Sequence, residues 1–307
     1  MVQNLSKRFV DEQDMRVDAL ESLIRHMDVH IIGHGLRISH ETLIKDYMFP
    51  DFLMFCFHHG TARLSHNGKT VELAPGSFYM YKPFEVYTGE LTCEPPFAFS
   101  YVYFNIYPYS ARIDFERNAF QAGDEVFARD WYRLAGASLE ELCSSVGAGL
   151  IGCRTMLEQS VKNIITHVLF DRLNYFPQAE CSFIGVKQAA LIDQTFACAE
   201  KHLSEPISID KTAKELGVSR TTLDRVFREA VQITPERALT RFKIERSLQF
   251  MKRGCSVKEA ANILGYSSSF HFSNTFLSVM GKRPSIYIEF MNRHQAHRPA
   301  AEPEQQD

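Results

Sequence analysis

Two short segments of the chain carry side chains that can recognise nucleobases. On the helices expected there, the outward positions of the first segment are Arg220, Thr221, Thr222, Asp224, Arg225 and Arg228. Those of the second are Ser268, Ser269, Phe270, His271, Ser273 and Asn274. Arginine can donate two hydrogen bonds to guanine, asparagine can pair with adenine, and an apolar side chain can contact the thymine methyl group. These residue types predict contact with double-stranded DNA, and a solvated helix surface is the plainer alternative.

The same pattern of residues surrounds both segments, which makes it an internal repeat. The first copy contains Ala213, Gly217, Ser219, Leu223, Phe227 and Pro235. The second contains Ala261, Gly265, Ser267 or Ser268, Phe272, Phe276 and Pro284. Matching positions lie 48 or 49 residues apart, and the extra residue falls in the turn of the second copy. Two copies in register are hard to attribute to chance.

Each copy has the features of a helix-turn-helix unit. The alanine leaves room where two helices cross. The glycine suits a helix end that requires positive φ, and the serine can cap the next helix through its hydroxyl. Apolar residues after the cap would hold the second helix against the core. A plain helical bundle is the competing interpretation.

The segment Pro235–Arg253 between the two copies is expected to form one helix, with proline in its first turn and Gly254 after its end. Such a helix would be roughly 27 Å long, which is comparable with the ~34 Å pitch of B-DNA. Two recognition helices could then enter successive major grooves.

The charge of the chain is unevenly distributed, although its net value is only −3. Residues 187–298 hold about 18 Lys and Arg against 11 Asp and Glu, whereas the residues before them hold about 16 against 23. The basic excess favours a polyanionic partner for the C-terminal part, although it is weak evidence alone.

These motifs resemble the AraC family of bacterial transcription regulators. The segments Gly265–Phe276 and Gly281–Ser285 are similar to the family signature, and Lys243–Met251 resembles its linker helix. The resemblance is strong over about residues 191–288. A looser similarity upstream, at His59-Gly60, Pro75-Gly76 and Tyr101–Phe104, points to the family's ligand-binding barrel.

The resemblance implies base contacts mainly at Thr221, Asp224 and Arg225, while Arg220 and Arg228 are expected to meet phosphates. The chain departs from the family at Asn274, where arginine is common. We therefore expect the two units to be unequal, with specific recognition depending mainly on the first.

The N-terminal region is expected to be an all-β unit between about His30 and Pro108, because short aromatic and β-branched runs alternate with turn signals. Asn67-Gly68 predicts a hairpin and Pro75-Gly76 a turn. Many short antiparallel strands need closure to hide their edges, so a jelly-roll or cupin-like barrel is predicted.

The barrel is a candidate sensor. Phe97, Phe99, Tyr101 and Tyr103 alternate along one expected strand and share a face, which suits either an ordinary core or a small ligand. By resemblance, the effector-binding residues would be His59, Tyr87, Phe99 and Tyr101, with Thr88 as an alternative to Tyr87. Aromatic faces stack on sugars, so a carbohydrate is the first expectation.

The overall expectation is an α+β multidomain protein: an N-terminal jelly-roll or cupin-like barrel with accessory helices and a C-terminal all-α domain with two helix-turn-helix units. The expected divisions are an N-terminal segment 1–29, a barrel 30–135, a helical dimerisation region 136–176, a linker 177–187, a DNA-binding domain 188–294 and a disordered tail 295–307. A single amphipathic helix is expected over Leu139–Arg172, packed on the barrel or on a second copy.

We expect a cytoplasmic protein without a membrane segment or secretory signal, acting as a homodimer and in contact with RNA polymerase. No cofactor and no metal is expected: seven scattered cysteines form no Cys-x-x-Cys pair, and neither they nor the histidines show convincing zinc-ligand spacing. Two alternatives stay open: a regulator without an effector, controlled by dimerisation or a protein partner, and a cupin-type enzyme fused to a helical domain. Adjacent His58 and His59 make the enzyme less favoured.

Overall fold

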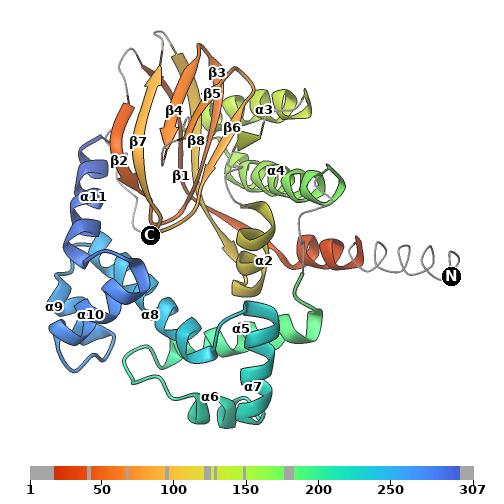
Figure 1. Ribbon diagram of the computed structural model, residues 1–307. Helices are drawn as coiled ribbons and strands as arrows, with labels where there is room; N and C mark the ends of the chain where they lie inside the picture. Colours follow the sequence, from red (N-terminus) through yellow and green to blue (C-terminus); the bar gives the residue numbers. More distant parts are fainter. Residues whose placement is uncertain are drawn as a thin grey trace, which may run out of the picture.

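The computed structural model describes residues 17–39, 43–66, 69–93, 97–120, 126–127, 130–147, 150–175 and 183–297. Figure 1 shows a β-rich N-terminal domain packed on a C-terminal domain made of helices. The expected α+β architecture is thereby confirmed. In the described ranges, no helix combines the length and the apolar character needed to cross a membrane.

Two antiparallel sheets build the N-terminal domain. One has the strand order β1-β8-β3-β6-β9 and the other β2-β7-β4-β5. The strands are β1 (Asp28–Ser39), β2 (Leu43–Met48), β3 (Phe52–His59), β4 (Ala62–His66), β5 (Lys69–Leu73), β6 (Phe78–Tyr81), β7 (Val86–Cys93), β8 (Phe97–Tyr107) and β9 (Val126–Phe127). The predicted hairpin at Asn67-Gly68 lies outside the described residues, while β4 and β5 on either side of it do pair.

Alternation along the central strand β3 divides the core into two layers. Leu53 and Phe57 join the aromatic cluster between the two sheets, whereas Phe52, Met54 and Cys56 face the helices on the outer side. This follows from the two-residue period of a strand, in which successive side chains point to opposite faces. The five-stranded sheet is therefore buried on both faces.

The expected single helix over Leu139–Arg172 is wrong, because the structure has two helices there. They are α3 (Asp130–Gly147) and α4 (Cys153–Tyr175), and Gly152 between them has a φ of +84° that ends the helical path. Both helices cover the outer face of the five-stranded sheet (Figure 1). The apolar stripe of α4 is buried in that core: Leu157, Val161, Ile164, Ile165, Val168 and Leu169. Of the two packing partners considered for this stripe, the structure has the barrel, and dimerisation stays a prediction.

The C-terminal domain consists of helices joined by short turns. They are α5 (Val186–Lys201), α6 (Ile209–Glu215), α7 (Arg220–Val226), the π-helical turn η1 (Phe227–Val231), α8 (Pro235–Lys252), α9 (Val257–Ile263), α10 (Ser269–Met280) and α11 (Pro284–His297). Residues 1–16, 177–182 and 298–307, which belong to the predicted N-terminal segment, linker and tail, lie outside the described part of the chain.

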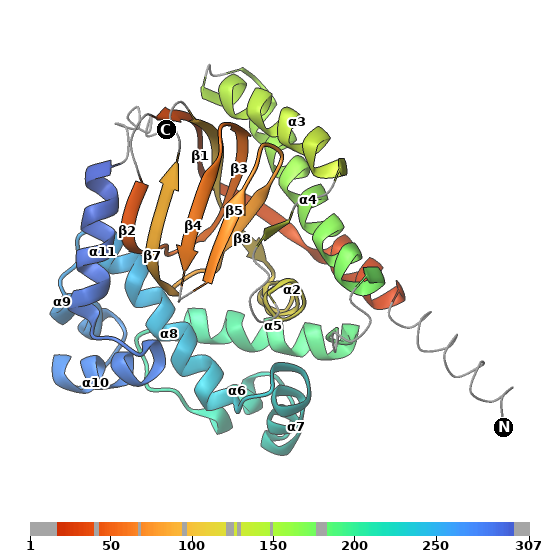
Figure 2. The same cartoon turned by 45° about the horizontal axis from the view of Figure 1, so that its top comes forward.

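Helix α2 (Tyr109–Ala119) connects the two domains. It follows β8 and packs against α5, as Figure 2 shows from a second side. The Tyr109 ring stacks on Phe196 of α5 with 3.9 Å between ring centroids, and the Ser110 backbone N–H and hydroxyl both donate to Asp193 at 2.8 Å. A second contact joins α11 to β2. The DNA-binding candidate is thus held by the barrel at two places.

Candidate nucleic-acid interface

Both predicted turns have the same hydrogen-bonded geometry. In the first, Val218 N–H donates to the Ala213 carbonyl at 3.0 Å, and Gly217 has a φ of +68°. In the second, Tyr266 N–H donates to the Ala261 carbonyl at 3.0 Å, and Gly265 has a φ of +71°. These bonds complete a Schellman ending, which satisfies carbonyls that the helix itself leaves free. The prediction of positive φ at both glycines is confirmed.

A serine starts each recognition helix. The Ser219 hydroxyl accepts from Thr222 N–H at 3.0 Å, and the Ser268 hydroxyl accepts from His271 N–H at 3.1 Å. The two caps are 49 residues apart, so the extra residue does lie in the second turn, and Ser268 rather than Ser267 is the cap. Each cap supplies an acceptor to an N–H group that the helix leaves unpaired.

The inner faces of both recognition helices are fixed by apolar burial. Leu223 and Phe227 are fully buried in one cluster, and Phe272 and Phe276 in another. Because these side chains hold one side of each helix against its domain, the remaining positions face outward. Each unit therefore presents its second helix on a separate small core.

The first recognition helix exposes arginines that are already paired within the protein. Arg220 lies 2.9 Å from Asp210, 2.8 Å from Glu236 and 3.8 Å from Asp224. Arg225 lies 3.3 Å from Glu229. Such solvent-exposed pairs contribute little stability, so phosphates or bases can replace the carboxylates at small cost.

The other candidates of the first unit also lie on the outer side. Thr221 and Arg228 are exposed, and Thr222 and Asp224 are partly exposed. Arg228 lies in η1, one turn beyond α7, where the helix widens instead of continuing. All six predicted residues of the first unit are thus at least partly exposed.

The second recognition helix is a regular α-helix without a charged outward residue among those predicted. Ser268, Ser269, Phe270, His271 and Asn274 are all exposed, and Phe270 is 73% exposed. The exposed ring is free to contact a thymine methyl group, which is the kind of apolar base contact predicted for this position. The cap bond at Ser268 gives that residue a structural role as well.

Helix α8 spaces the two units and is fixed to both by one lysine. Thr234 caps it, Pro235 stands at its first position, and it ends at Lys252, close to the predicted end at Arg253. Lys243 donates from Nζ to the carbonyls of Glu205, before α6, and of Leu264, after α9. Burial lowers the pKa of Lys243, and these two acceptors compensate for its desolvation.

A buried ion-pair cluster, which the sequence did not reveal, joins α8 to α2 of the barrel domain. Glu245 accepts from the Tyr109 hydroxyl at 2.6 Å and lies 3.2 Å from Arg112 and 2.9 Å from Arg241. Burial alone would raise the pKa of Glu245, but the two guanidinium groups hold it below its usual value. Arg241 is one helical turn from Glu245, but Tyr109 and Arg112 lie more than 100 residues before it, so spacing along the chain gave no signal for the contact between the domains.

The predicted effector residues do not all lie together. Phe99 and Tyr87 are buried in the aromatic cluster between the sheets, and Tyr101 packs against the same cluster. His59 is exposed at the end of β3. The predicted shared face of Phe97, Phe99, Tyr101 and Tyr103 agrees with this cluster. His58 hydrogen-bonds Ser100 at 2.7 Å, so the two adjacent histidines have different surroundings.

Comparisons with known proteins agree with the C-terminal geometry. Residues 212–289 match the family model of a helix-turn-helix domain. The chain is 28% identical over 126 residues to the raffinose operon transcriptional regulatory protein RafR of Pediococcus pentosaceus, covering 41% of this chain and 45% of that protein. It is 31% identical over 102 residues to the HTH-type transcriptional regulator GbdR of Pseudomonas aeruginosa (strain UCBPP-PA14), covering 33% and 28%. The aligned part is thus less than half of either relative.

Among solved structures, the crystal structure of ToxT from Vibrio cholerae O395 covers 87% of this chain and 98% of its own, with 15% identity and a TM-score of 0.48. The family assignment therefore rests on the C-terminal sequence and on the duplicated turn geometry. The C-terminal region of this chain belongs to the AraC-type helix-turn-helix domains.

Proposed function

We propose that this protein is a transcription regulator that binds double-stranded DNA with both helix-turn-helix units. The observation that carries the proposal is the pair of recognition helices, each capped, buried on one face and exposed on the other, on either side of α8. Every side chain predicted to meet DNA is at least partly exposed. A transcription regulator acts on DNA inside the cell and on the enzyme that transcribes it. A cytoplasmic location and contact with RNA polymerase therefore belong to the same proposal.

Selection from a random duplex library tests this proposal. Full-length protein should enrich a sequence with two conserved elements about one helical turn apart, which is the spacing of successive major grooves. Its affinity should fall steeply as salt rises, because phosphate contacts release counterions. Failure to enrich any sequence at low salt would contradict the proposal.

The barrel is proposed to sense a small molecule, with a carbohydrate as the first candidate. Phe99 and Tyr101 belong to an aromatic cluster that includes hydroxyl groups, and aromatic faces with a few polar atoms suit a sugar. The Tyr101 hydroxyl lies close to Gly35 of β1, where a side-chain carbon would come within 2.6 Å of it. Because Gly35 has no side chain, the Tyr101 ring has room to pack against the cluster.

Thermal melting in the presence of sugars and other small metabolites tests the sensor. A ligand that binds only the folded protein stabilises it by RT ln(1 + [L]/Kd), so the melting temperature should rise with concentration. The variant Tyr101→Phe keeps the ring and removes the hydroxyl, and it should weaken that response. If no compound shifts melting, control by homodimerisation or by a protein partner becomes the better account.

A further inference from the structure

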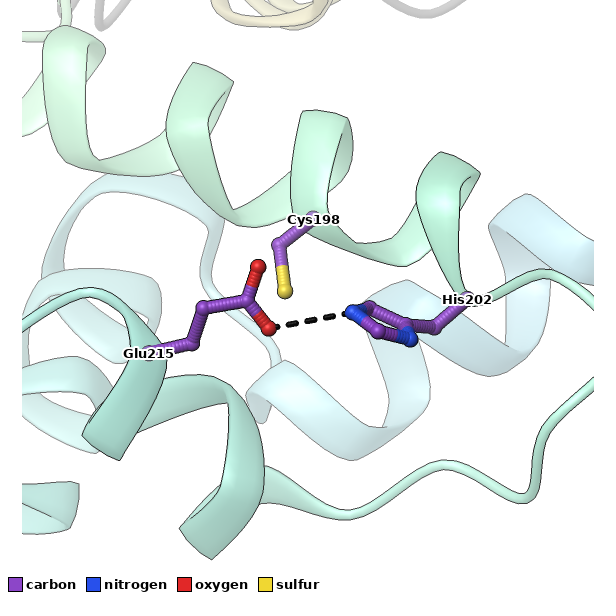
Figure 3. Close-up of side chains that lie close together, drawn as sticks. All are labelled: Cys198, His202 and Glu215. Carbon is purple, nitrogen blue, oxygen red and sulfur yellow. Dashed lines mark hydrogen bonds and ion pairs between the residues drawn. The ribbon is translucent and has the colours of Figure 1, made fainter.

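One group of potential metal ligands lies in the first helix-turn-helix region and includes none of the residues expected to face DNA. Cys198 and His202 come from α5, four residues apart and thus on one face of that helix, and Glu215 is the last residue of α6 (Figure 3). The three ligand atoms all lie within 4.8 Å of one another. Within the described part of the chain, no other three such side chains meet this closely.

We propose that Cys198, His202 and Glu215 bind a divalent transition metal ion, with zinc as the best match. Zinc takes sulfur, imidazole nitrogen and carboxylate oxygen at about 2.0–2.3 Å, which places neighbouring ligand atoms of a tetrahedron roughly 3.3–3.7 Å apart. His202 Nε2 and the Glu215 carboxylate oxygen are 3.1 Å apart. The Cys198 sulfur lies within 4.8 Å of both atoms, so a shift toward them would complete the ligand set.

The orientation of His202 is the one that a metal ligand requires. Its other ring nitrogen, Nδ1, lies 2.9 Å from a Glu205 carboxylate oxygen, and Nε2 points toward Glu215. A carboxylate on the outer nitrogen fixes the ring and makes the inner nitrogen a better donor, as in many zinc sites. Glu205 is also paired with Lys211 at 2.5 Å, so it is itself held in place.

Charge and space at the site agree with a divalent ion. A thiolate, a carboxylate and a neutral imidazole carry two negative charges, which the ion neutralises. A cavity of about 30 Å³ is lined by all three residues, enough for one ion or water molecule. Nearby Lys243 points its ammonium group at the carbonyls of Glu205 and Leu264 instead.

Three protein ligands leave a fourth position for water, which in zinc proteins is typical of an exchangeable site. Metal ligation requires the Cys198 thiolate and an unprotonated His202 Nε2, so the protons carried by these two atoms leave to solvent. Without metal, burial and the hydrogen bond to Glu215 raise the pKa of the thiol, so the cysteine stays protonated. The ion would connect α5 to α6 and so stabilise the first helix-turn-helix unit, whether or not the protein binds DNA.

Cobalt binding to the chelator-treated full-length protein provides the test. One equivalent of Co²⁺ should produce a thiolate-to-metal absorption band, which Zn²⁺ then removes by displacement. Cys198→Ser should lose the band, while Cys255→Ser, a partly buried cysteine of the same domain outside the group, should keep it. Glu205→Gln should weaken binding by about 10–100-fold, because it removes the partner that orients His202.

A second measurement on the unaltered protein covers the case in which a variant does not fold. Zn²⁺ should slow alkylation of Cys198 but not of Cys255, as mapped on peptides, and should raise the melting temperature. If Co²⁺ gives no thiolate band and Zn²⁺ leaves the alkylation of Cys198 unchanged, the proposal is overturned. His202 and Glu215 then form an ion pair and nothing more.

Discussion

The two helix-turn-helix units share one backbone design and differ in the charges around it. Between residues 205 and 236 the first unit has five basic and six acidic residues, whereas the second has three basic and one acidic between residues 254 and 284. In the first unit, two of the basic residues, Arg220 and Arg225, lie in the recognition helix itself, and Arg228 follows in η1. In the second, the exposed Lys282 and Arg283 follow the recognition helix.

We expect this difference in charge to give the two units different roles, one in base specificity and the other in affinity for DNA. Arg225 is expected to select a base and Arg220 to meet a phosphate, but carboxylates of the same unit already pair with both. The second unit is expected to meet DNA with Phe270 and Asn274, and its basic residues have fewer acidic residues around them. We therefore expect the first unit to provide most of the base selection, and the second to contribute phosphate attraction that is less dependent on sequence.

The turns differ as well. At Gly265, an added side-chain carbon would lie 1.8 Å from the Ser204 carbonyl oxygen, whereas at Gly217 nothing lies within 4 Å. Gly265→Ala should therefore destabilise the protein by about 3 kcal/mol or more, because backbone must move. Gly217→Ala should cost only about 1 kcal/mol for its positive φ. Urea unfolding of both variants measures the difference, and equal losses would refute the close contact between the units.

The recognition helices should respond unequally to alanine. Arg225→Ala should reduce discrimination at one base pair by about 1–3 kcal/mol, because the two hydrogen bonds to guanine are lost. Asn274→Ala should have a smaller effect on specificity. Binding titrations on operator variants check this order, and a greater loss of specificity with Asn274→Ala would reverse the roles assigned to the two units.

The smallest expected effect concerns the residues that follow the two recognition helices. Gln232 after the first and Gly281 after the second are 49 residues apart, and both adopt the left-handed conformation, with φ of 64° and 72°. A residue with a β-carbon is strained there. Gln232→Gly should stabilise the protein by up to about 1 kcal/mol, and Gly281→Gln should destabilise it by about the same amount. Thermal melting of both variants is the measurement, and a destabilising Gln232→Gly would show that its side chain makes a contact that outweighs the strain.

Sequence alone predicted those parts of the interface that depend on neighbouring residues. Both helix ends, both caps and the spacer helix follow from glycine, serine and proline at fixed offsets, because these residues act on the backbone next to them. The interior of the β domain followed from alternation, since side chains two residues apart share a face of a strand. In contrast, the helical period over Leu139–Arg172 continued past the break at Gly152, because periodicity is insensitive to one turn of non-helical backbone.

Contacts between distant segments were not predictable from local patterns. Glu245 and Arg112 meet only because α2 packs on α8, and Arg220 meets Glu236 only because the turn after η1 brings α8 back to α7. The metal-ligand group belongs with these contacts. Cys198 and His202 are one helical turn apart, but their spacing predicted no metal site, and Glu215 comes from the next helix and required the fold.

We propose that both units contact one DNA molecule. Missing-base interference on the sequence selected by the full-length protein tests it most directly, because it shows which bases the bound protein needs. We predict two interference zones about 10 base pairs apart on one face of the duplex. In Arg225→Ala, interference should disappear at the base pair assigned to Arg225 and persist in the zone assigned to α10. A single zone, or interference that is unchanged in Arg225→Ala, would contradict the proposal.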